Sequence, residues 1–553
     1  MHGLMMDAPL MISSLLAHAD RCHGDTEIVS RTAEGPIHRY TYREAHSRAR
    51  RLANALARLG VKPGDRVGSL AWNGFRHFEL YYAVSGMGAV IHTINPRLFP
   101  EQIRYMIGHA EDALVFYDIT FAPLVESLAA ACPGVKAWVP LTDHDHRPAS
   151  PKSALPCYEE LVGAEADSFE WPAFDEDTAA GLCYTSGTTG NPKGVLFSHR
   201  STILHAYAIS LPDATDLSAC SVILPIVPMF HVNAWGIPYA APLVGAKLVF
   251  PGPGLDGASL YELFENEQVT RSSGVPTVWL NLLNYMRAQG LRFSTLKKAV
   301  IGGAACPPAM IRTLNEEFGV EVQHGWGMTE MSPVGTINAP KQKHFAWTPA
   351  QRFTQSLKQG RPVYGVDLKI VDGDGRELPR DAEAFGNLLV KGAWVARRYF
   401  RDEGGDPLTP DGWFPTGDVG TLDQDGYLQI TDRSKDVIKS GGEWISSIEL
   451  ENVAVGHPAV LEAAAIGLWH PKWDERPLLV VVKKPGAEVT REELLAFYEG
   501  RVAKWARPGD IVFVSELPHT ATGKLSKLTL RQQFKGYTWP SEAGDKSLAD
   551  TKR

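Results

Sequence analysis

The sequence has few cysteines, and none of them are spaced as in a disulfide framework or a zinc site. Its six cysteines are scattered between Cys22 and Cys306 of a 553-residue chain, without a Cys-x-x-Cys pair. Isolated cysteines of this kind are typical of reduced thiols in an intracellular compartment. The spacing therefore excludes a small disulfide-stapled secreted scaffold and predicts a cytoplasmic location.

Long hydrophobic runs are also missing. The most apolar region, residues 221–250, is too broken to cross a bilayer, because it contains Pro225, Pro228, His231 and Lys247. The N-terminus has no basic segment before its short apolar stretch, and residues 551–553 do not form a peroxisomal signal. We expect no signal peptide and no stable membrane insertion.

A surplus of positive charge is absent as well. The chain has 55 Lys and Arg residues against 63 Asp and Glu residues, which gives a formal net charge of −8. This balance argues against nucleic acid or an anionic membrane as the main partner, although it is compatible with a local basic pocket for a polyphosphate. The length exceeds what one hydrophobic core supports, so we expect two or more domains.

Short apolar runs alternate with amphipathic segments along the first 300 or so residues. The apolar runs lie at 66–72, 89–94, 113–118, 221–227, 246–250 and 298–301, with helical patterns such as 42–59 and 101–110 between them. This alternation predicts βαβ units and largely parallel sheets. Residues 142–176 and the basic segment 337–360 have no period, and we interpret both as solvated surface connections rather than as binding patches.

A second boundary falls near residues 432–436. Beyond it the pattern predicts a compact unit with a strand at 436–439, a helix from about 446, strands near 462–467 and 478–483, and a helix at 491–504. A unit of this size can fold as a separate domain. We expect the polar tail after about residue 537 to be disordered.

The most informative stretch is residues 184–195, Tyr-Thr-Ser-Gly-Thr-Thr-Gly-Asn-Pro-Lys-Gly-Val. Its hydroxyl groups and glycines supply many donors and let the backbone approach an anion closely, and Lys193 adds a point charge suited to phosphate. Pro192 and Gly194 flank this lysine, so the stretch differs from a P-loop, in which a helix begins at the lysine. A flexible surface loop is the alternative, but the density of donors favours a nucleotide-phosphate loop.

Two further segments follow apolar strands. His231 and Trp235 come after the run at 221–227, and Gly302 and Gly303 close the run at 298–301. Paired glycines at the edge of a parallel sheet allow a flat ligand to approach the backbone. By residue type alone, His231 and Trp235 favour packing in the core.

Residues 324–330 read His-Gly-Trp-Gly-Met-Thr-Glu and combine three kinds of ligand-binding group. Trp326 can stack on a purine, Thr329 can donate to a phosphate, and Glu330 offers the hard oxygen that magnesium requires. The alternative is a glycine-flanked turn with a packed tryptophan. The phosphate loop upstream favours the ligand-binding interpretation.

Candidate residues also lie in the last third of the chain. Asp418 follows a Thr-Gly pair and can accept hydrogen bonds from ribose hydroxyls, and Arg433 can bind ribose or phosphate. Residues 518–524, Pro-His-Thr-Ala-Thr-Gly-Lys, present Lys524 from a turn. Taken separately, Thr-Gly-Asp is an ordinary turn, and a surface lysine normally serves solubility.

Taken in order from residue 184 to residue 524, these segments resemble the motifs of the adenylate-forming superfamily, which comprises acyl-CoA synthetases, peptide-synthetase adenylation domains and beetle luciferases. The Pro-x-Thr-x-Thr-Gly-Lys motif is complete at every fixed position, whereas Asn387 replaces a glutamate of many relatives at a structural position. The resemblance implies an α/β fold with a large N-terminal domain of layered, mostly parallel sheets and helices at 1–434. A small mobile α+β C-terminal domain would follow at 435–553, with its hinge at Lys435.

The resemblance also implies roles for individual residues. Lys524, His231, Glu330 and Thr185 would be catalytic, and Glu330 would hold the metal. The acyl substrate would contact His231, Trp235, Gly302 and Gly303. The nucleotide and the coenzyme would contact Thr185, Ser186, Gly187, Thr188, Thr189, Gly190, Lys193, Gly302, Gly303, Ala304, His324, Gly325, Trp326, Gly327, Met328, Thr329, Asp418, Ile430, Arg433, Lys439, Gly441, Gly442 and Lys524.

The implied activity is that of a ligase that uses ATP, magnesium and coenzyme A to convert a carboxylic acid into acyl-AMP and then into acyl-CoA, releasing AMP and pyrophosphate. We expect no carrier domain after Lys524, so free coenzyme A is the predicted acceptor. His231 stands where amino-acid-activating relatives have an aspartate for the substrate ammonium, which favours a plain carboxylic acid. The motifs look most like those of medium-chain fatty-acyl-CoA synthetases, including 3-methylmercaptopropionate–CoA ligases, and Trp235 is expected to shorten the acyl pocket.

Three alternatives stay open at this point. A luciferase-like oxygenase would share the adenylation step, and an amino-acid-activating module would need a partner for an ammonium group. A non-catalytic nucleotide-binding regulator would be expected to have lost Lys524 or Glu330, and both are present. A homodimer is compatible with the sequence, which does not identify the physiological acid.

Overall fold

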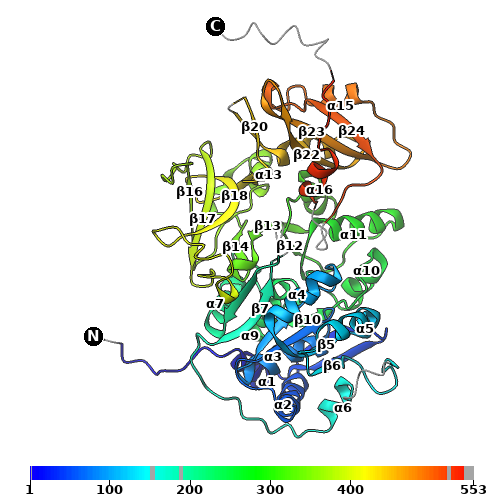
Figure 1. Ribbon diagram of the computed structural model, residues 1–553, viewed down its shortest axis with the longest axis vertical. Coiled ribbons are helices and arrows are strands. Elements are labelled where there is room, and N and C mark those ends of the chain that lie inside the picture. The colour runs from blue at the N-terminus through cyan, green and yellow to red at the C-terminus, as the bar shows by residue number, and fades with distance from the viewer. Residues whose placement is uncertain (2, 150–155, 186–190, 442, 520–524, 541–553) are drawn as a thin grey trace.

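The computed structural model describes residues 1, 3–149, 156–185, 191–441, 443–519 and 525–540. Its elements follow one long axis, with the N-terminal helices and strands at one end and the residues after about 440 at the other (Figure 1). Across the described ranges the strands form four sheets. Two of them build the N-terminal body, the third flanks this body, and the fourth belongs to the C-terminal unit.

A six-stranded sheet in the N-terminal body has the strand order β6-β5-β3-β4-β7-β8. Its neighbouring strands are parallel except for β7 and β8, which are antiparallel. The strands are β3 (Arg66–Leu70), β4 (Val90–Thr93), β5 (Asp112–Tyr117), β6 (Ala137–Pro140), β7 (Ala179–Tyr184) and β8 (Gly194–Ser198). The predicted phosphate loop therefore connects two neighbouring strands at the end of a parallel sheet.

A nine-stranded sheet has the order β15-β14-β13-β12-β11-β9-β10-β1-β2 and is parallel from β13 to β1. Its strands are β1 (Glu27–Arg31), β2 (Ile37–Thr41), β9 (Val222–Pro225), β10 (Lys247–Phe250), β11 (Arg271–Gly274), β12 (Lys298–Ile301), β13 (Glu321–Gly327), β14 (Val334–Ile337) and β15 (Arg361–Pro362). Parallel strands end at a common edge, so the segments that follow β9 and β12 meet the end of β13 there.

The helices of the N-terminal body are α1 (Ile12–His23), α2 (Tyr42–Arg58), α3 (Phe75–Gly86), α4 (Pro100–Ala110), α5 (Ala122–Ala131), α6 (Tyr158–Gly163), α7 (His199–Ser210), α9 (Ile237–Val244), α10 (Gly257–Asn266), α11 (Pro276–Gln289) and α12 (Pro308–Arg312). A reciprocal capping box between Thr41 and Glu44 begins α2. Every residue of α3 is buried, because α1 and α2 pack on it and the main hydrophobic core encloses it. This buried layer keeps the two sheets in a fixed relation.

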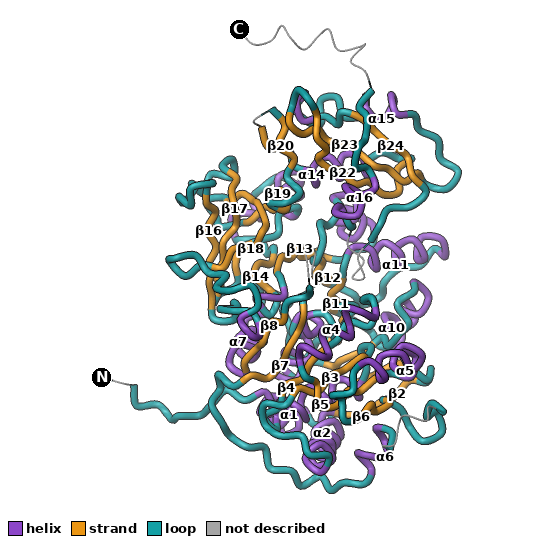
Figure 2. The backbone as a smooth tube through the Cα atoms, in the orientation of Figure 1, coloured by secondary structure: helices purple, strands orange, loops and turns teal. Residues whose placement is uncertain are grey.

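An antiparallel sheet of β16 (Val366–Val371), β17 (Phe385–Gly392), β18 (Phe414–Leu422) and β19 (Leu428–Arg433) flanks the N-terminal body (Figure 2). Its register places Asp418 of β18 directly opposite Arg433 of β19. Two predicted ligand-binding residues that are far from the phosphate loop in sequence thus share one edge of this sheet.

The C-terminal unit is a five-stranded sheet with helices. Its strand order is β21-β20-β23-β22, with β24 parallel to β23. The elements are β20 (Ile438–Ser440), β21 (Glu443–Ile445), α14 (Ser447–Val455), β22 (Val460–His470), β23 (Asp474–Lys483), α15 (Arg491–Phe497), β24 (Asp510–Val514) and α16 (Lys527–Gln533). Apolar residues of α14, β22, β23 and α15 form a core of their own. This confirms the predicted α/β fold with a separate C-terminal domain.

Several segments differ from the sequence-based expectation. The stretch 142–176, expected to be a solvated connection, contains helix α6 with Tyr158 buried. The helix expected at 491–504 ends at Phe497, because the chain turns through Gly500, whose φ is 70°. The stretch 337–360, expected to be a loop, contains helix α13 (Pro349–Ser356), which begins at a Thr348 cap. The helix has only eight residues and few apolar side chains, so the pattern did not reveal it.

The basic residues of this segment are engaged within the protein. Lys341 and Lys358 pair with Asp425 at 3.2 Å and with Asp423 at 2.6 Å, respectively. Arg352 donates to the backbone carbonyl of Trp347 at 2.8 Å. The two lysines therefore hold the turn between β18 and β19.

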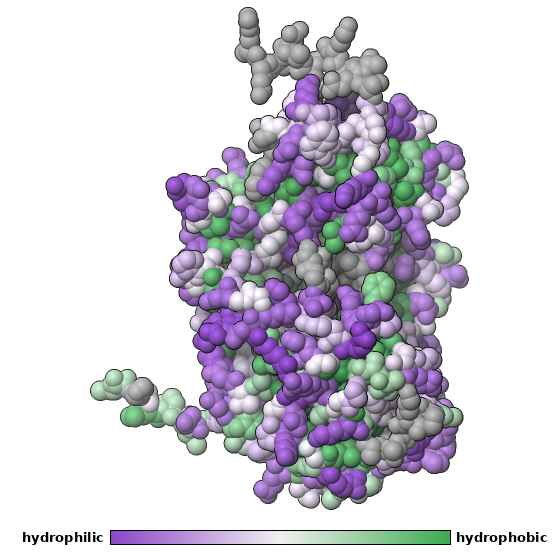
Figure 3. Space-filling view, viewed as in Figure 1, coloured by the Kyte–Doolittle hydropathy of each residue, from purple (hydrophilic) through white to green (hydrophobic). Residues whose placement is uncertain are grey.

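The two ends of the chain pack differently. Before α1 the chain extends away from the body and exposes Leu4 and Met5 (Figure 3). Trp539, in the part expected to be disordered, instead packs on the last domain and donates to the backbone carbonyl of Trp469 at 2.9 Å, and residues 541–553 lie outside the described ranges. None of the helices in the described ranges has the length and apolarity needed to span a bilayer.

Candidate active site

A cavity of about 380 Å³ lies where the end of the nine-stranded sheet meets the flanking sheet and the C-terminal domain. The predicted residues that line it are Thr185, Lys193, His231, Trp235, Gly302, Gly303, Gly325, Trp326, Gly327, Met328, Thr329, Glu330, Arg433 and Lys435. The lining residues that the motifs did not indicate are Asn191, Val232, Val300, Pro333, Val334, Thr336, Ile337, Thr416, Asp436 and Leu525. Motifs from all parts of the chain therefore converge on one space.

Trp326, Asp418 and Arg433 form a hydrogen-bonded group at this cavity. The indole Nε1 of Trp326 donates to Asp418 Oδ2 at 2.8 Å, and Nε of Arg433 lies 2.8 Å from Asp418 Oδ1. Asp418 is 3% exposed, and its backbone N–H donates to Thr416 Oγ1 at 3.0 Å. A carboxylate fixed by two donors retains acceptor capacity for the hydroxyl groups of a ligand.

Lys193, Tyr399 and Glu330 form a second group. The Tyr399 hydroxyl donates to Glu330 Oε1 at 2.8 Å, and the Lys193 ammonium lies 4.7 Å from the centre of the Tyr399 ring. Glu330 is 8% exposed, and burial raises the pKa of its carboxyl while the bond from Tyr399 opposes that rise. The Lys193 ammonium thus faces the Tyr399 ring, and the buried Glu330 carboxylate accepts from the hydroxyl group of the same side chain.

The phosphate loop is closed at its base. The Thr185 N–H donates to the Lys193 carbonyl at 2.9 Å, and the Lys193 N–H donates to Thr185 Oγ1 at 3.2 Å. The residue before the loop, Tyr184, shares a 2.7 Å hydrogen bond with His109 of α4. The predicted residues Ser186, Gly187, Thr188, Thr189 and Gly190 lie outside the described ranges.

His231 and Trp235 reach the cavity from an unusual turn after β9. The four residues of α8 (Val232–Trp235) all have positive φ, between 45° and 56°. Left-handed backbone costs about 1–2 kcal/mol per non-glycine residue, so four in succession are unfavourable unless the surroundings impose them. Such conformations cluster at functional sites, which agrees with the position of this turn at the cavity.

Several contacts hold the left-handed turn in place. The Pro228 carbonyl accepts from the N–H groups of His231 at 3.0 Å and Ala234 at 3.2 Å. The buried Cys183 thiol donates to Asn233 Oδ1 at 3.7 Å. These bonds come from the first sheet and from the end of β9, so both sheets contribute to the conformation that carries Trp235.

The Trp235 indole packs against the paired glycines after β12. A Cβ atom at Gly302 would lie 3.4 Å from the ring and 2.7 Å from the backbone oxygen of Gly325, and a Cβ at Gly303 would lie 3.5 Å from the ring. A side chain at Gly302 would therefore collide with β13. The glycine pair leaves room for the indole at the end of the cavity.

Some predicted residues do not line the cavity, and one of them is Asp418, whose partners Trp326 and Arg433 do. His324 is buried, shares a 3.1 Å hydrogen bond with the Leu357 carbonyl, and has its pKa lowered to about 4 by burial. Ile430 donates its N–H to Gln359, which also contacts His324. Ala304 is exposed beside the paired glycines.

The predicted coenzyme-binding residues lie on the C-terminal domain, away from the cavity. Lys439 is exposed on β20, and Gly441 follows this strand with a φ of 61°. The Gly441 N–H donates to the Trp473 carbonyl at 2.8 Å. Gly442 and the predicted catalytic lysine, Lys524, lie outside the described ranges.

The C-terminal domain nevertheless contributes to the cavity wall. Lys435 and Asp436, which precede β20, and Leu525, which precedes α16, all line the cavity. Partial burial lowers the pKa of the Lys435 ammonium. Lys193, Arg433 and Lys435 thus present three basic groups to one space, an arrangement suited to a polyphosphate.

Tyr399 is the main feature of the site that the sequence did not indicate. It lies in the irregular segment between β17 and β18, and no motif or period marks it. The apolar residues Val334 and Ile337 of β14 were missed for a similar reason, since a four-residue antiparallel strand has a weak pattern. Only the fold brings Val334 and Ile337 to the cavity and Tyr399 to Glu330 and Lys193.

Comparisons with known proteins agree with this geometry. The chain matches the model of the AMP-binding enzyme family over residues 16–400 and that of the AMP-binding enzyme C-terminal domain over 449–524. It is 52% identical over 535 residues to a 3-methylmercaptopropionyl-CoA ligase of Ruegeria lacuscaerulensis, which covers 97% of this chain and 99% of that protein. It is 51% identical over 534 residues to a medium-chain-fatty-acid–CoA ligase of Ectopseudomonas oleovorans, with 97% and 98% covered.

The structure is also similar to the crystal structure of the anthranilate CoA ligase AuaEII in complex with anthranoyl-AMP, with a TM-score of 0.84, 25% identity, and 96% and 98% of the two chains covered. The first family model spans both sheets of the N-terminal body, and the second begins in α14 of the C-terminal domain. The resemblance seen in the motifs is therefore confirmed, and the chain belongs to the AMP-binding enzyme family.

Proposed function

We propose that this protein is an AMP-forming carboxylate–CoA ligase. It joins a carboxylic acid to the α-phosphate of ATP, releasing pyrophosphate, and then transfers the acyl group from acyl-AMP to the thiol of coenzyme A, releasing AMP. The observation that carries this proposal is the convergence of the Trp326–Asp418–Arg433 group, the phosphate loop and the left-handed turn on one cavity. The ligase names of the relatives at about half identity support it.

The first half-reaction needs neutralisation of charge, because an anionic carboxylate attacks an anionic phosphate. Thr185, Thr329 and Lys193 supply donors and positive charge for the phosphates, and Lys524 bridges the attacking carboxylate and the α-phosphate. Trp326 packs on the adenine, while Asp418 accepts from the ribose hydroxyls. The family resemblance implies these roles, and the position of Thr185, Lys193, Trp326 and Thr329 around one cavity supports them.

Glu330 has the properties of a magnesium ligand. One carboxylate oxygen is held by Tyr399, and no side chain among the described residues hydrogen-bonds to the other. In the part of the chain that the structure describes, no three His, Cys, Asp or Glu side chains gather into a metal cluster. Glu330 would hold magnesium together with phosphate oxygens of ATP, because magnesium is usually bound by one or two carboxylates and by substrate phosphates. When bound, the metal neutralises charge on the transferring phosphate.

The second half-reaction requires a path for the thiol to the acyl carbon. We place the domain boundary between residues 434 and 435 and the hinge at Lys435, and we assign Lys439, Gly441 and Gly442 to the pantetheine path. Leu525 directly follows Lys524 and lines the cavity, which supports a role for the C-terminal motif in adenylation. Rotation of the C-terminal domain would then remove Lys524 and admit the thiol.

The acid is a short- or medium-chain one. The cavity of about 380 Å³ has to accommodate nucleotide phosphates as well as the acyl group, and the Trp235 indole occupies its end beside the paired glycines. His231, which lines the cavity, provides no anion for a substrate ammonium. Fatty acids and 3-methylmercaptopropionate, the acids named for the relatives, fit these constraints. The cytoplasmic location and a homodimer stay predictions.

The proposal is tested with a panel of acids from acetate to dodecanoate, together with 3-methylmercaptopropionate, in the presence of ATP, magnesium and coenzyme A. AMP and acyl-CoA should form in equal amounts, with the highest rate among the shorter acids. Formation of AMP without thioester, accompanied by oxygen uptake, would instead identify a luciferase-like oxygenase. Binding of ATP without turnover of any acid would identify a regulator and overturn the proposal.

A further inference from the structure

Tyr399 contacts two residues of the proposed ATP site at the same time. Its hydroxyl donates to Glu330 Oε1 at 2.8 Å, and its ring faces the Lys193 ammonium at 4.7 Å. Glu330 follows β13 and Lys193 precedes β8, so these two residues come from different sheets. The reaction as proposed above assigns Tyr399 no task.

The segment that carries Tyr399 is held close to the phosphate loop. The Ala396 N–H donates to the backbone carbonyl of Glu330 at 2.6 Å. At the other end, Gly404 has a φ of 86°, and a Cβ atom there would lie 2.6 Å from Lys193 Nζ. The backbone of this segment therefore approaches both Glu330 and Lys193 as closely as it can.

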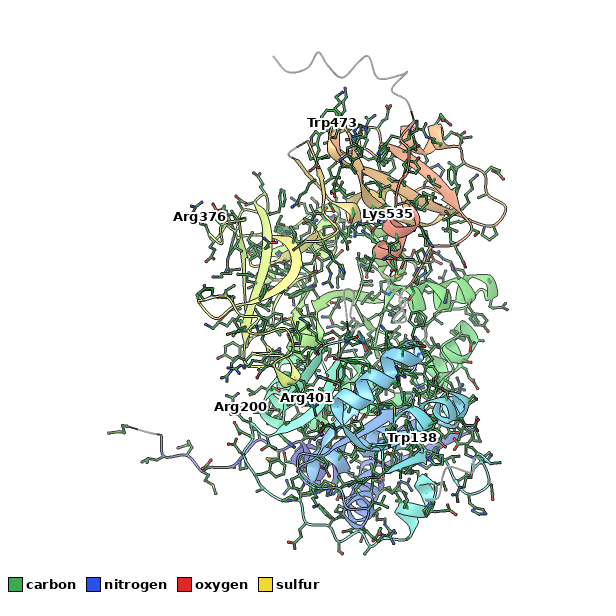
Figure 4. The ribbon with its side chains drawn as sticks, in the orientation of Figure 1. Trp138, Arg200, Arg376, Arg401, Trp473 and Lys535 are labelled. Carbon is green, nitrogen blue, oxygen red and sulfur yellow. The ribbon has the colours of Figure 1, made fainter. Side chains whose placement is uncertain are left out.

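Further contacts anchor the same segment to the N-terminal body. Arg401, labelled in Figure 4, pairs with Glu111 after α4 at 2.7 Å. Glu403 accepts from the hydroxyl of Tyr105 in α4 at 3.0 Å. The Tyr399 ring packs edge-on against Phe414 of β18, with ring centres 6.1 Å apart. The segment that carries the tyrosine is thus fixed by helix α4 and by the flanking sheet together.

This geometry has a direct consequence for metal binding. A carboxylate that binds a metal through one oxygen is oriented when its other oxygen accepts a hydrogen bond from a neighbouring group. An ammonium over the face of an aromatic ring is held there by the negative face of the ring. A single tyrosine can therefore set both the rotamer of a metal ligand and the position of a phosphate-binding lysine.

We propose that Tyr399 is a positioning residue for the ATP–magnesium complex: its hydroxyl orients Glu330 toward the metal, and its ring holds Lys193 toward the phosphates. This inference depends on the proposed function of the site. The two contacts should have different effects. The hydroxyl group should affect ATP binding only when magnesium is present, whereas the ring should affect it with or without the metal.

Two substitutions separate these contacts. Tyr399→Phe removes the hydroxyl and keeps the ring, and Tyr399→Leu removes both. Binding of a non-hydrolysable ATP analogue is measured by calorimetry with and without magnesium. Magnesium should increase the affinity of the wild-type protein for the analogue. We expect this increase to be roughly 10-fold smaller in Tyr399→Phe, while binding without magnesium stays unchanged. Tyr399→Leu should weaken both.

A matched control is available in the N-terminal body. The Tyr158 hydroxyl donates to the buried carboxylate of Glu79 at 2.6 Å, so Tyr158→Phe removes a similar tyrosine–glutamate bond outside the cavity. We expect Tyr158→Phe to lower the melting temperature and to leave the magnesium-dependent gain intact. In the double variant Tyr399→Phe/Glu330→Gln, the loss should be smaller than the sum of the single losses, because both act on one interaction.

The outcomes are distinct. The inference would be overturned if either folded variant of Tyr399 kept the wild-type increase in ATP affinity on addition of magnesium. It would also be overturned if Tyr158→Phe lost as much of this increase. Both results would leave the ligase proposal intact. If the wild-type protein itself showed no magnesium-dependent ATP binding and formed no acyl-AMP, the proposed function would fail and this inference with it. Exchange of labelled pyrophosphate into ATP, measured at several magnesium concentrations, gives a second measurement of the magnesium dependence of each variant.

Discussion

Asp418 illustrates how one buried carboxylate can organise a ligand-binding wall. It accepts from Trp326 on the nine-stranded sheet and pairs with Arg433 on the flanking sheet, each at 2.8 Å. The two donors belong to different layers, so the orientation of the carboxylate is fixed by the packing of the layers. A hydroxyl group of a ligand would meet an acceptor that needs little reorganisation on binding.

Replacement of Asp418 by asparagine keeps the shape of the side chain and removes its charge. Hydrogen bonds to a charged group contribute about 1.5–3 kcal/mol, so the affinity for ATP should fall by roughly 10-fold or more. Calorimetric titration with ATP measures this change. Asp423→Asn is a suitable control, because Asp423 pairs with Lys358, which does not line the cavity, whereas both partners of Asp418 do. Equal losses of ATP affinity in both variants would contradict the assignment.

The position of Trp235 leads to a prediction about the chain length of the acid. Its indole lies against Gly302 and Gly303 at the end of the cavity, so Trp235→Ala should enlarge the space for the acyl chain. The ratio of kcat/KM for long over short acids should rise, by a factor on the order of 10 for each two methylene groups newly accommodated. If the melting temperature falls while the chain-length profile is unchanged, Trp235 serves only packing.

At the scale of elements, the left-handed turn of α8 is the most constrained part of the site. Gly236 ends the turn with a φ of 79°, and a Cβ atom there would lie 2.7 Å from the ring of His205. His205 in turn accepts a hydrogen bond from the Val334 N–H at 3.2 Å, and Val334 lines the cavity. A side chain at Gly236 would therefore affect the turn that carries Trp235 and, through His205, also Val334.

Gly236→Ala should lower the free energy of unfolding by about 3 kcal/mol, because left-handed strain and an overpacked contact add together. It should also raise KM for the acid. Gly290→Ala is a matched control, since Gly290 has a φ of 67° with no atom within 4 Å of its added Cβ. That variant should lose about 1 kcal/mol from strain alone and keep its KM. Chemical denaturation and steady-state kinetics give both quantities.

At the scale of the whole molecule, the proposal requires one C-terminal domain to serve two half-reactions. The structure gives this domain its own core, and Leu525, which precedes its helix α16, lines the cavity together with Lys435. Lys524 would act while the carboxylate meets the α-phosphate and would have to leave before the thiol arrives. A substitution at the catalytic lysine and one at the hinge should then affect different steps.

Lys524→Ala should reduce formation of acyl-AMP by roughly 10²–10³, the effect of one lost transition-state donor, and leave conversion of supplied acyl-AMP to acyl-CoA nearly unchanged. Lys435→Pro should do the reverse, because proline fixes φ at the pivot. Lys435→Ala controls for loss of the side chain and should retain thioester formation. Each half-reaction is measured separately in all three variants. Equal depression of both steps in Lys524→Ala would contradict the alternation of domains.

The local pattern of the sequence determined much of this protein. The short apolar runs correspond to strands such as β3 and β12, because the length and apolarity of a buried strand are encoded within a few residues. The glycines and hydroxyl groups of residues 184–195, and the order of the motifs, were enough to identify the family, since donor density and spacing are local properties.

Other features were decided only by tertiary structure. The pairing of Asp418 with Trp326 depends on how two sheets pack, and the contact of Tyr399 with Glu330 depends on where an irregular segment crosses the body. The left-handed turn that carries Trp235 opposes the intrinsic preference of each of its residues and is imposed by bonds from two sheets. Contacts between residues far apart in the chain, and backbone held against its own preference, leave no periodic trace in a sequence, and the chemistry of this site is built from both.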